Sequence, residues 1–201
     1  MQIGQKKYNH LKILFIGKTR ERIFKFFKKN NISYFHYNEF DEFITNYKSY
    51  NFLISYGCNK IFDRKVISYF KNSIINCHQS YLPWNRGADP NLWSFVDGTT
   101  KGVTIHKIEE KIDQGDILLR KKIKIDPQTH TFETSYELLL KHLDKLLINN
   151  FDYLIENKLK AIKQPNFGTF NFKDDKKKFK FDDKQLWKIN IKEFLKKIKN
   201  V

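Results

Sequence analysis

The hydrophobic and polar positions in the first half of the chain alternate between short apolar runs and longer amphipathic stretches. Four runs rich in Ile, Leu and Phe predict strands at residues 11–17, 32–36, 51–57 and 74–76. Between them, apolar side chains at helical spacing predict helices at residues 19–30 (with Thr19 as N-cap), 40–47 and 63–70. Strands that alternate with helices favour an α/β fold, a Rossmann-like and mainly parallel sheet with helices on both faces.

The second half of the chain adds a short helix, two strands and one long helix. The short helix is expected at residues 88–96, and strands at 102–108 and 115–125 are expected to pair antiparallel. A capping box of Thr134 and Glu137 predicts the start of a helix over residues 134–157, in which Leu, Tyr and Ile recur at helical spacing.

The pattern changes at Gln164, so we divide the chain into a domain at residues 1–163 and a tail at residues 164–201. An amphipathic C-terminal helix is predicted in this tail from Leu186, Trp187, Ile191, Phe194, Leu195 and Ile198. Such a helix can dock on its own domain, on a second copy in a homodimer, or on a membrane surface. Docking on protein is the commoner outcome.

Composition and charge narrow the function classes. A chain with 40% hydrophobic and 16% aromatic residues is too apolar to be disordered. The net charge of +16 suits an anionic partner, which could be nucleic acid, an anionic membrane or a phosphorylated substrate. Each half of the chain carries +8, which argues against a single basic arm.

Cysteine usage and the first residues indicate the compartment. Cys58 and Cys77 form no disulfide framework and no metal-binding spacing. Residues 1–9 are polar and basic, and no apolar run approaches membrane length. We therefore expect a cytoplasmic protein with no metal and no membrane partner.

An Asn and a His two residues apart, Asn76 and His78, stand at the end of a predicted buried strand. Residues two apart on a strand share a face, so both side chains can converge on one point. Asp113, in a turn before Gly115, could reach the same edge. An amide, an imidazole and a carboxylate suffice for acyl transfer to an amine, because they can stabilise an oxyanion and relay a proton. Taken singly, each of these residues is more often a turn former or a core residue than a catalytic group.

Three segments stand out in combination: residues 76–88 (NCHQSYLPWNRGA), 102–105 (GVTI) and 112–117 (IDQGDI). Together they resemble the formyltransferase family that uses N10-formyltetrahydrofolate, which includes glycinamide ribonucleotide, methionyl-tRNA and nucleotide-sugar formyltransferases. Residues 81–93 look most like the sugar N-formyltransferases, and Gln164–Pro165 is similar to their tail. Cys77 and Asn171 depart from the family, which usually has an aliphatic residue and a His there.

The resemblance implies a sugar N-formyltransferase that modifies the amine of a nucleotide-linked amino-dideoxy sugar, such as dTDP-4-amino-4,6-dideoxyglucose, for O-antigen or lipopolysaccharide. N10-formyltetrahydrofolate is the implied co-substrate. The implied catalytic residues are Asn76, His78 and Asp113. The implied folate-binding residues are Ile54, Tyr56, Gly57, Ile112, Gln114, Gly115 and Asp116. The implied substrate-binding residues are Ser80, Tyr81, Trp84, Arg86, Asp89, Trp93 and His106.

Other functions stay open at this point. The amine could belong to methionyl-tRNA, although that group carries a further C-terminal β-barrel domain, for which the residues after Gly168 are too few. A nucleic-acid-binding module would use the positive charge and the aromatics that interleave with Lys in residues 167–181, but it would leave the strand-end motifs unexplained. An inactive relative is a further alternative, although all three catalytic residue types are present.

Overall fold

A six-stranded sheet forms the centre of the computed structural model, which describes residues 7–38 and 46–199. Its strands are β1 (Lys12–Gly17), β2 (Ser33–Tyr37), β3 (Phe52–Tyr56), β4 (Ile74–His78), β6 (Gly102–Lys107) and β7 (Ile117–Lys122). Their order is β2-β1-β3-β4-β6-β7, and β6 pairs antiparallel with both of its neighbours while the other pairings are parallel. The mainly parallel α/β sheet and the antiparallel pair at its end are therefore confirmed. The helix expected at 40–47 lies largely outside the described residues.

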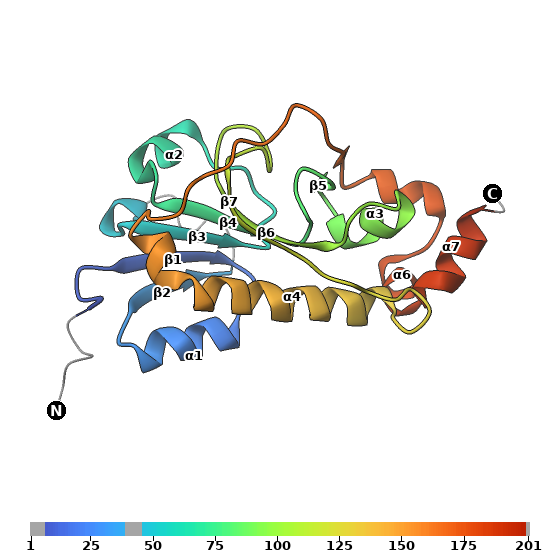
Figure 1. Cartoon of the computed structure of the whole chain (residues 1–201), viewed down its shortest axis with the longest axis horizontal. Coiled ribbons are helices and arrows are strands. Elements are labelled where there is room, and N and C mark those ends of the chain that lie inside the picture. Colours follow the sequence, from blue (N-terminus) through green and yellow to red (C-terminus); the bar gives the residue numbers. More distant parts are fainter. Residues whose placement is uncertain (1–6, 39–45, 200–201) are drawn as a thin grey trace.

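Helices cover both faces of this sheet (Figure 1). They are α1 (Glu21–Lys29), α2 (Arg64–Phe70), α3 (Pro90–Val96), α4 (Phe132–Asn149), α5 (Phe151–Ile155), α6 (Asp183–Lys188) and α7 (Ile191–Lys199). Alternate residues of β1 divide between two hydrophobic clusters. Ile13 and Phe15 pack on the side of α1 and α4, while Leu14 and Ile16 pack on the side of α2. Burial on both faces explains why the strand is a continuous apolar run.

The ends of two predicted helices were wrong. Arg20, rather than Thr19, occupies the N-cap position of α1, and the Thr19 hydroxyl bonds to Asn38 instead. Helix α4 begins at Phe132, because the Thr131 hydroxyl accepts a hydrogen bond from the Thr134 N–H and forms the capping box one turn earlier than expected.

The long predicted helix over residues 134–157 is also interrupted. Helix α4 ends at Asn149, and Asn150 separates it from α5. The Asn150 side chain donates to the Leu146 carbonyl, which competes with the helical backbone pattern. Apolar periodicity continues across the break, since Phe151 and Leu154 remain buried. The spacing of apolar residues alone could not reveal it.

The tail forms two short helices, α6 and α7, where one C-terminal helix was expected. The Asn190 side chain lies between them and accepts from the Lys192 N–H. Leu186 and Phe194 are buried in the large hydrophobic cluster, and the Phe194 ring lies 5.1 Å from that of Phe132. The tail thus docks on its own domain. The division at residue 163 stays a prediction.

A second, two-stranded sheet joins this tail to the middle of the chain. It consists of β5 (Arg86–Gly87) and β8 (Phe170–Asn171), which pair in parallel. A short 3-10 helix, η2 (Asp175–Phe179), follows β8, and another, η1 (Tyr47–Ser49), precedes β3.

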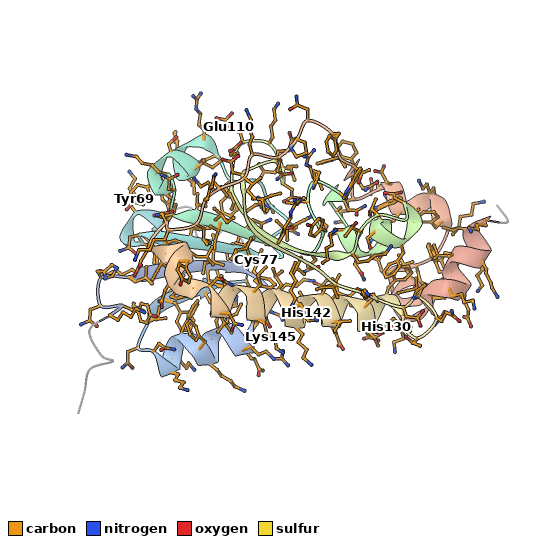
Figure 2. The ribbon with its side chains drawn as sticks, in the orientation of Figure 1. Tyr69, Cys77, Glu110, His130, His142 and Lys145 are labelled. Atoms are coloured by element: carbon orange, nitrogen blue, oxygen red, sulfur yellow. The ribbon has the colours of Figure 1, made fainter. Side chains whose placement is uncertain are left out.

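The two cysteines are free thiols. Cys77 is buried near the middle of the molecule (Figure 2), and Cys58 is half-buried. Burial raises the pKa of both thiols, so both stay protonated and unreactive near neutral pH. In the described parts of the chain, every helix is too short or too polar to cross a membrane.

Candidate active site

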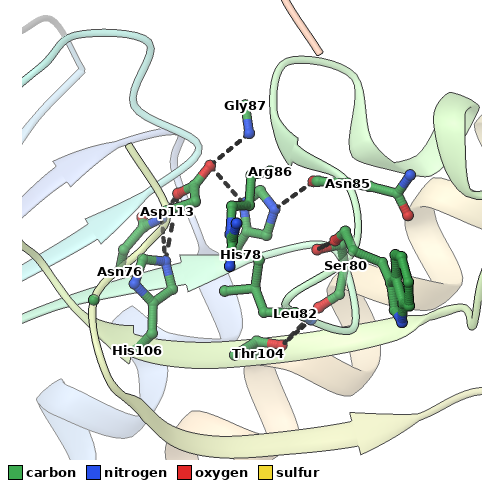
Figure 3. A network of polar contacts seen from close by, with 12 residues as sticks. Asn76, His78, Ser80, Leu82, Asn85, Arg86, Gly87, Thr104, His106 and Asp113 are labelled. Atoms are coloured by element: carbon green, nitrogen blue, oxygen red, sulfur yellow. Dashed lines mark hydrogen bonds and ion pairs between the residues drawn. The ribbon is translucent and has the colours of Figure 1, made fainter. Parts of the chain in front are cut away.

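The candidate site lies at the carboxyl end of β4, where Asn76 and His78 are the third and fifth residues of the strand. Their side chains project from the same face, as their spacing predicted (Figure 3). The antiparallel β6 places His106 directly opposite Asn76 in the strand register. The Asn76 Nδ2 atom lies 3.1 Å from His106 Nε2. The end of β4 therefore presents an amide and two imidazoles together.

The loop between β6 and β7 brings Asp113 to these side chains. Asp113 has φ 53°, a left-handed conformation that Asp adopts more readily than most residues. The loop folds back closely on β6, since the Asp116 carbonyl accepts from the Lys107 N–H at 2.9 Å. A Cβ atom on Gly115 would lie 1.9 Å from the Lys107 carbonyl oxygen, so only glycine fits there.

Asp113 is the centre of the resulting polar network (Figure 3). One carboxylate oxygen, Oδ1, accepts from Asn76 Nδ2 at 3.1 Å and lies 3.4 Å from His106 Nε2. The other, Oδ2, accepts from the Gly87 N–H at 2.8 Å and lies 3.6 Å from His78 Nδ1. The three residue types predicted as catalytic are thus brought into direct contact.

Hydrogen bonds to backbone carbonyls define which nitrogen of each imidazole carries the proton. His106 Nδ1 donates to the Lys107 carbonyl at 2.7 Å, which leaves Nε2 of the neutral ring as an acceptor. His78 Nε2 donates to the Asn85 carbonyl at 3.0 Å. Nδ1 of neutral His78 therefore faces Asp113 without a proton, so the pair can accept one from a substrate.

The loop that carries Gly87 is held by the tail. The Arg86 N–H donates to the Thr169 carbonyl at 3.0 Å, and the Ala88 N–H donates to the Asn171 carbonyl at 2.9 Å. Gly87 has φ +83°, and a Cβ atom there would lie 2.4 Å from the Asn171 oxygen. The Gly87 N–H that binds Asp113 is thus fixed by β8.

Gln164 connects the same loops through side chains. Its Oε1 atom accepts from Nε and Nη2 of the buried Arg86, at 3.2 and 2.9 Å. Its Nε2 atom donates to the carbonyls of Asp113 and Gly115, at 2.9 and 2.7 Å. Arg86 therefore serves to hold the site together, since its guanidinium points toward the tail.

The electrostatic environment keeps His78 neutral and Asp113 ionised. Burial lowers the pKa of His78, and the carboxylate of Asp113 opposes this only in part. Burial would raise the pKa of Asp113, but His78, His106 and the Gly87 N–H together hold it well below its ordinary value. The pair carries one negative charge near neutral pH and has room for one proton.

We expect His78 to stay neutral at pH 6.5, the ordinary pKa of a histidine, and to take up a proton only at lower pH. Because the unfolded chain binds that proton first, the contribution of His78 to stability is lost as pH falls below 6.5. NMR titration of the imidazole carbons, with His78→Gln to identify the signal, measures the pKa. In Asp113→Asn it should fall further, because the carboxylate raises it. A His78 pKa above 6.5 in the wild type would contradict the burial argument.

An open cleft of about 670 Å³ lies over this network. The predicted site residues that line it are Asn76, His78, Asp113, Gly57, Ile112, Asp89 and His106. Apolar side chains of the loops after β3 and β6, including Ile61 and Ile108, line one part. Among the described residues, no group of three His, Cys, Asp or Glu side chains could hold a metal ion.

Other predicted site residues lie outside the cleft lining: Ile54, Tyr56, Gln114, Gly115, Asp116, Ser80, Tyr81, Trp84, Arg86 and Trp93. Ile54 and Tyr56 belong to the core on the α4 side, where the Tyr56 hydroxyl donates to Asp144 at 2.9 Å. Trp93 is buried beneath η2, with its ring 5.6 Å from that of Phe179. Ile54, Tyr56 and Trp93 thus pack in the core, and none of the ten residues lines the cleft. Their assigned substrate and cofactor roles stay predictions.

Sequence reasoning missed many of the residues that line the cleft, among them Lys18, Gln79, Tyr136 and Trp187. Lys18 directly follows β1, and Gln79 directly follows β4, so the rule that ligands bind beyond strand ends pointed to both. Tyr136 and Trp187 were assigned to the apolar faces of helices. An apolar stripe cannot distinguish an aromatic ring in the core from one at the rim of a cleft.

Comparison with known proteins shows which family the sequence matches. The family model described as formyl transferase matches residues 19–150. The dTDP-4-amino-4,6-dideoxyglucose formyltransferase of Mycobacterium bovis is 27% identical over 129 residues, covering 63% of this chain and 53% of that protein. A methionyl-tRNA formyltransferase of Prochlorococcus marinus is 39% identical over 118 residues, covering 53% of this chain and 35% of that protein. The chain thus spans about half the length or less of these curated relatives.

One solved structure matches over almost its full length. It is the formyltransferase PseJ from Anoxybacillus kamchatkensis, in complex with UDP-4,6-dideoxy-4-formamido-L-AltNAc and tetrahydrofolate. The TM-score is 0.83 and the identity 33%, with 92% of this chain and 98% of that chain covered.

Proposed function

The chain belongs to the formyl transferase family, and from this we propose that it transfers a formyl group from N10-formyltetrahydrofolate to the amino group of a nucleotide-linked amino-dideoxy sugar. The Anoxybacillus kamchatkensis protein supports this proposal, because it binds a UDP-linked formamido sugar and tetrahydrofolate. Those two molecules are what such a transfer would leave behind.

The observation that carries the proposal is the position of the Asp113 carboxylate, which lies 3.1 Å from Asn76 Nδ2 and 3.6 Å from His78 Nδ1 in the floor of the cleft. The arrangement offers an amide donor and a proton acceptor, and the direct attack of an amine on an acyl carbon needs both. The apolar part of the cleft, with Ile61 and Ile112 exposed, fits the flat ring system of a folate.

The residues would divide the chemistry as follows. The folate co-substrate supplies the formyl group. Asn76 would exchange its hydrogen bond to His106 for one to the formyl oxygen, where negative charge builds as the amine adds. The facing atoms His78 Nδ1 and Asp113 Oδ2 would accept the proton that the amine releases. They would return it to the folate nitrogen as the bond between that nitrogen and the formyl carbon breaks, so that the pair ends the step as it began.

We expect the purified protein to formylate one member of a panel of UDP-, dTDP- and GDP-linked amino-dideoxy sugars, with the folate product followed by its absorbance. Methionyl-tRNA is the second substrate to test, because methionyl-tRNA formyltransferases are also similar to this chain. The matched amino sugar without its nucleotide serves as the control. Turnover on methionyl-tRNA with none on any sugar would replace the sugar proposal.

We further propose that the net charge of +16 serves these anionic substrates and not nucleic acid, since it is divided equally between the two halves of the chain. A cytoplasmic location and a homodimer stay predictions from the sequence.

A further inference from the structure

The cleft has a second, polar part whose role the transfer chemistry does not explain. Lys18, Gln79, Tyr136 and Trp187 line it, and we call these four residues the Tyr136 arm. Tyr136 packs against the cluster on the α4 side of the sheet, whereas Ile108 in the apolar part packs against the cluster on the α2 side. The two parts of the cleft therefore lie over opposite faces of the sheet, with Asn76 and His78 at the strand end between them.

The Tyr136 hydroxyl accepts two hydrogen bonds, from Lys18 Nζ at 3.2 Å and from Gln79 Nε2 at 3.4 Å. It also carries a proton of its own, and no described residue accepts it. Lys18 forms no ion pair with a described carboxylate. A positive charge beside a hydroxyl that can still donate is the chemistry that binds a phosphate oxygen.

Lys176 of η2 also lines the cleft, but unlike Lys18 it forms ion pairs. Lys176 lies 3.3 Å from an oxygen of Asp89 and 2.8 Å from one of Asp183. Two carboxylates offset its charge, so it joins the wall of the cleft to α6. Lys18 is therefore the better placed of the two cations to bind an anion.

The aromatic part of the arm fits a flat ring. The rings of Tyr136 and Trp187 lie 4.9 Å apart with the edge of one toward the face of the other, and Trp187 keeps 37% of its surface exposed. Phe170 and Phe172, both exposed, also line the cleft. Exposed aromatic rings beside a phosphate-binding group can stack on a nucleobase, which gains favourable free energy with any base.

We propose that the Tyr136 arm is the subsite for the nucleoside diphosphate of the substrate. The diphosphate binds Lys18 and the Tyr136 hydroxyl, and the base stacks on Trp187. This inference rests on the proposed function, because it concerns the nucleotide end of the same substrate. In this assignment Trp187 of α6 contacts the nucleotide directly, and the apolar part of the cleft remains for the folate.

The test compares Lys18→Met, Tyr136→Phe and Trp187→Ala with Lys141→Met, which removes an exposed charge from α4 outside the cleft. Lys18→Met and Tyr136→Phe should each raise the KM for the nucleotide sugar by about tenfold to a hundredfold, as loss of a bond to a charged group does. Trp187→Ala should raise it by about fivefold to a hundredfold, as loss of a stacked base does. The KM for the formyl-folate should not change. A rise in the folate KM alone would overturn the inference, since the arm would then hold the folate carboxylates.

Calorimetry with UDP and dTDP keeps this inference separate from the proposed function. The wild type and Lys141→Met should bind at least one of the two, and Lys18→Met should bind it about tenfold or more weakly. Binding that depends on Lys18, without formyl transfer to any sugar, would overturn the proposed function alone. The absence of UDP and dTDP binding in the wild type, or equal affinity in Lys18→Met, would overturn the subsite.

Discussion

His78→Ala should lose about a hundredfold to ten-thousandfold of formyl-transfer turnover while the protein stays folded, the range that loss of a positioned acid or base produces. Nδ1 of His78 faces Asp113 at 3.6 Å, and its other nitrogen is held by the Asn85 carbonyl at 3.0 Å. Without the imidazole, Asp113 loses the partner with which it holds the amine proton.

Asp113→Asn tests the other half of the pair with almost no change in shape, and it should lose turnover to a similar extent. His142→Ala is the matched control for His78→Ala, because it also replaces a histidine by alanine, but on α4 and outside the cleft. Thermal melting confirms that each variant is folded. Turnover close to wild type in both His78→Ala and Asp113→Asn would refute the assigned mechanism.

Asp144→Ala should lower the free energy of unfolding by about 3–5 kcal/mol, the cost of leaving one member of a buried ion pair without its partner. The Asp144 carboxylate on α4 is 1% exposed and accepts from Arg20 Nε at 3.1 Å, from Arg20 Nη2 at 2.7 Å and from the Tyr56 hydroxyl at 2.9 Å. The substitution strands a guanidinium whose side chain is only 17% exposed. Urea unfolding measures the loss.

Asp152→Ala is the control for this prediction, since its ion pair with Lys7 is about half exposed. Loss of this pair and of the hydrogen bond from the Tyr8 hydroxyl should together cost about 1–2 kcal/mol. The double variant Arg20→Met with Asp144→Leu should recover much of the loss, because two apolar side chains leave no charge unpaired. If Asp144→Ala and Asp152→Ala lowered the free energy of unfolding equally, the buried network would stabilise the protein no more than the Lys7–Asp152 pair does, and the prediction would be wrong.

The strands and the convergence of Asn76 and His78 could be predicted because their signals are local. Buried strands are short apolar runs, and the spacing of Asn76 and His78 already placed both side chains on one face. Asp113 needed the family resemblance, since its approach depends on a glycine 1.9 Å from a backbone oxygen on another strand. No pattern along the chain encodes that distance.

The walls of the site could not be predicted for a related reason. Tyr136 and Trp187 carry the same apolar signal as core residues, and Trp93 carries the signal of a ligand-stacking ring although it is buried. The guanidinium of Arg86 bonds to Gln164, 78 positions along the chain, a contact that its sequence motif does not reveal, and its predicted role toward substrate stays a prediction. Such roles depend on which segments of distant sequence meet.

The pairing of β5 with β8 has a consequence for how the protein acquires activity during synthesis. The sheet and the three predicted catalytic residues are complete in sequence once residue 122 has been made. The Gly87 amide that binds Asp113 is fixed only when Asn171 arrives beside it. While residues 164–171 are still inside the ribosome, the nascent chain can form its sheet but lacks the strand that fixes the Gly87 loop. The fixed position of the Gly87 amide beside Asp113 is therefore reached late in translation, after all six strands of the sheet have been made.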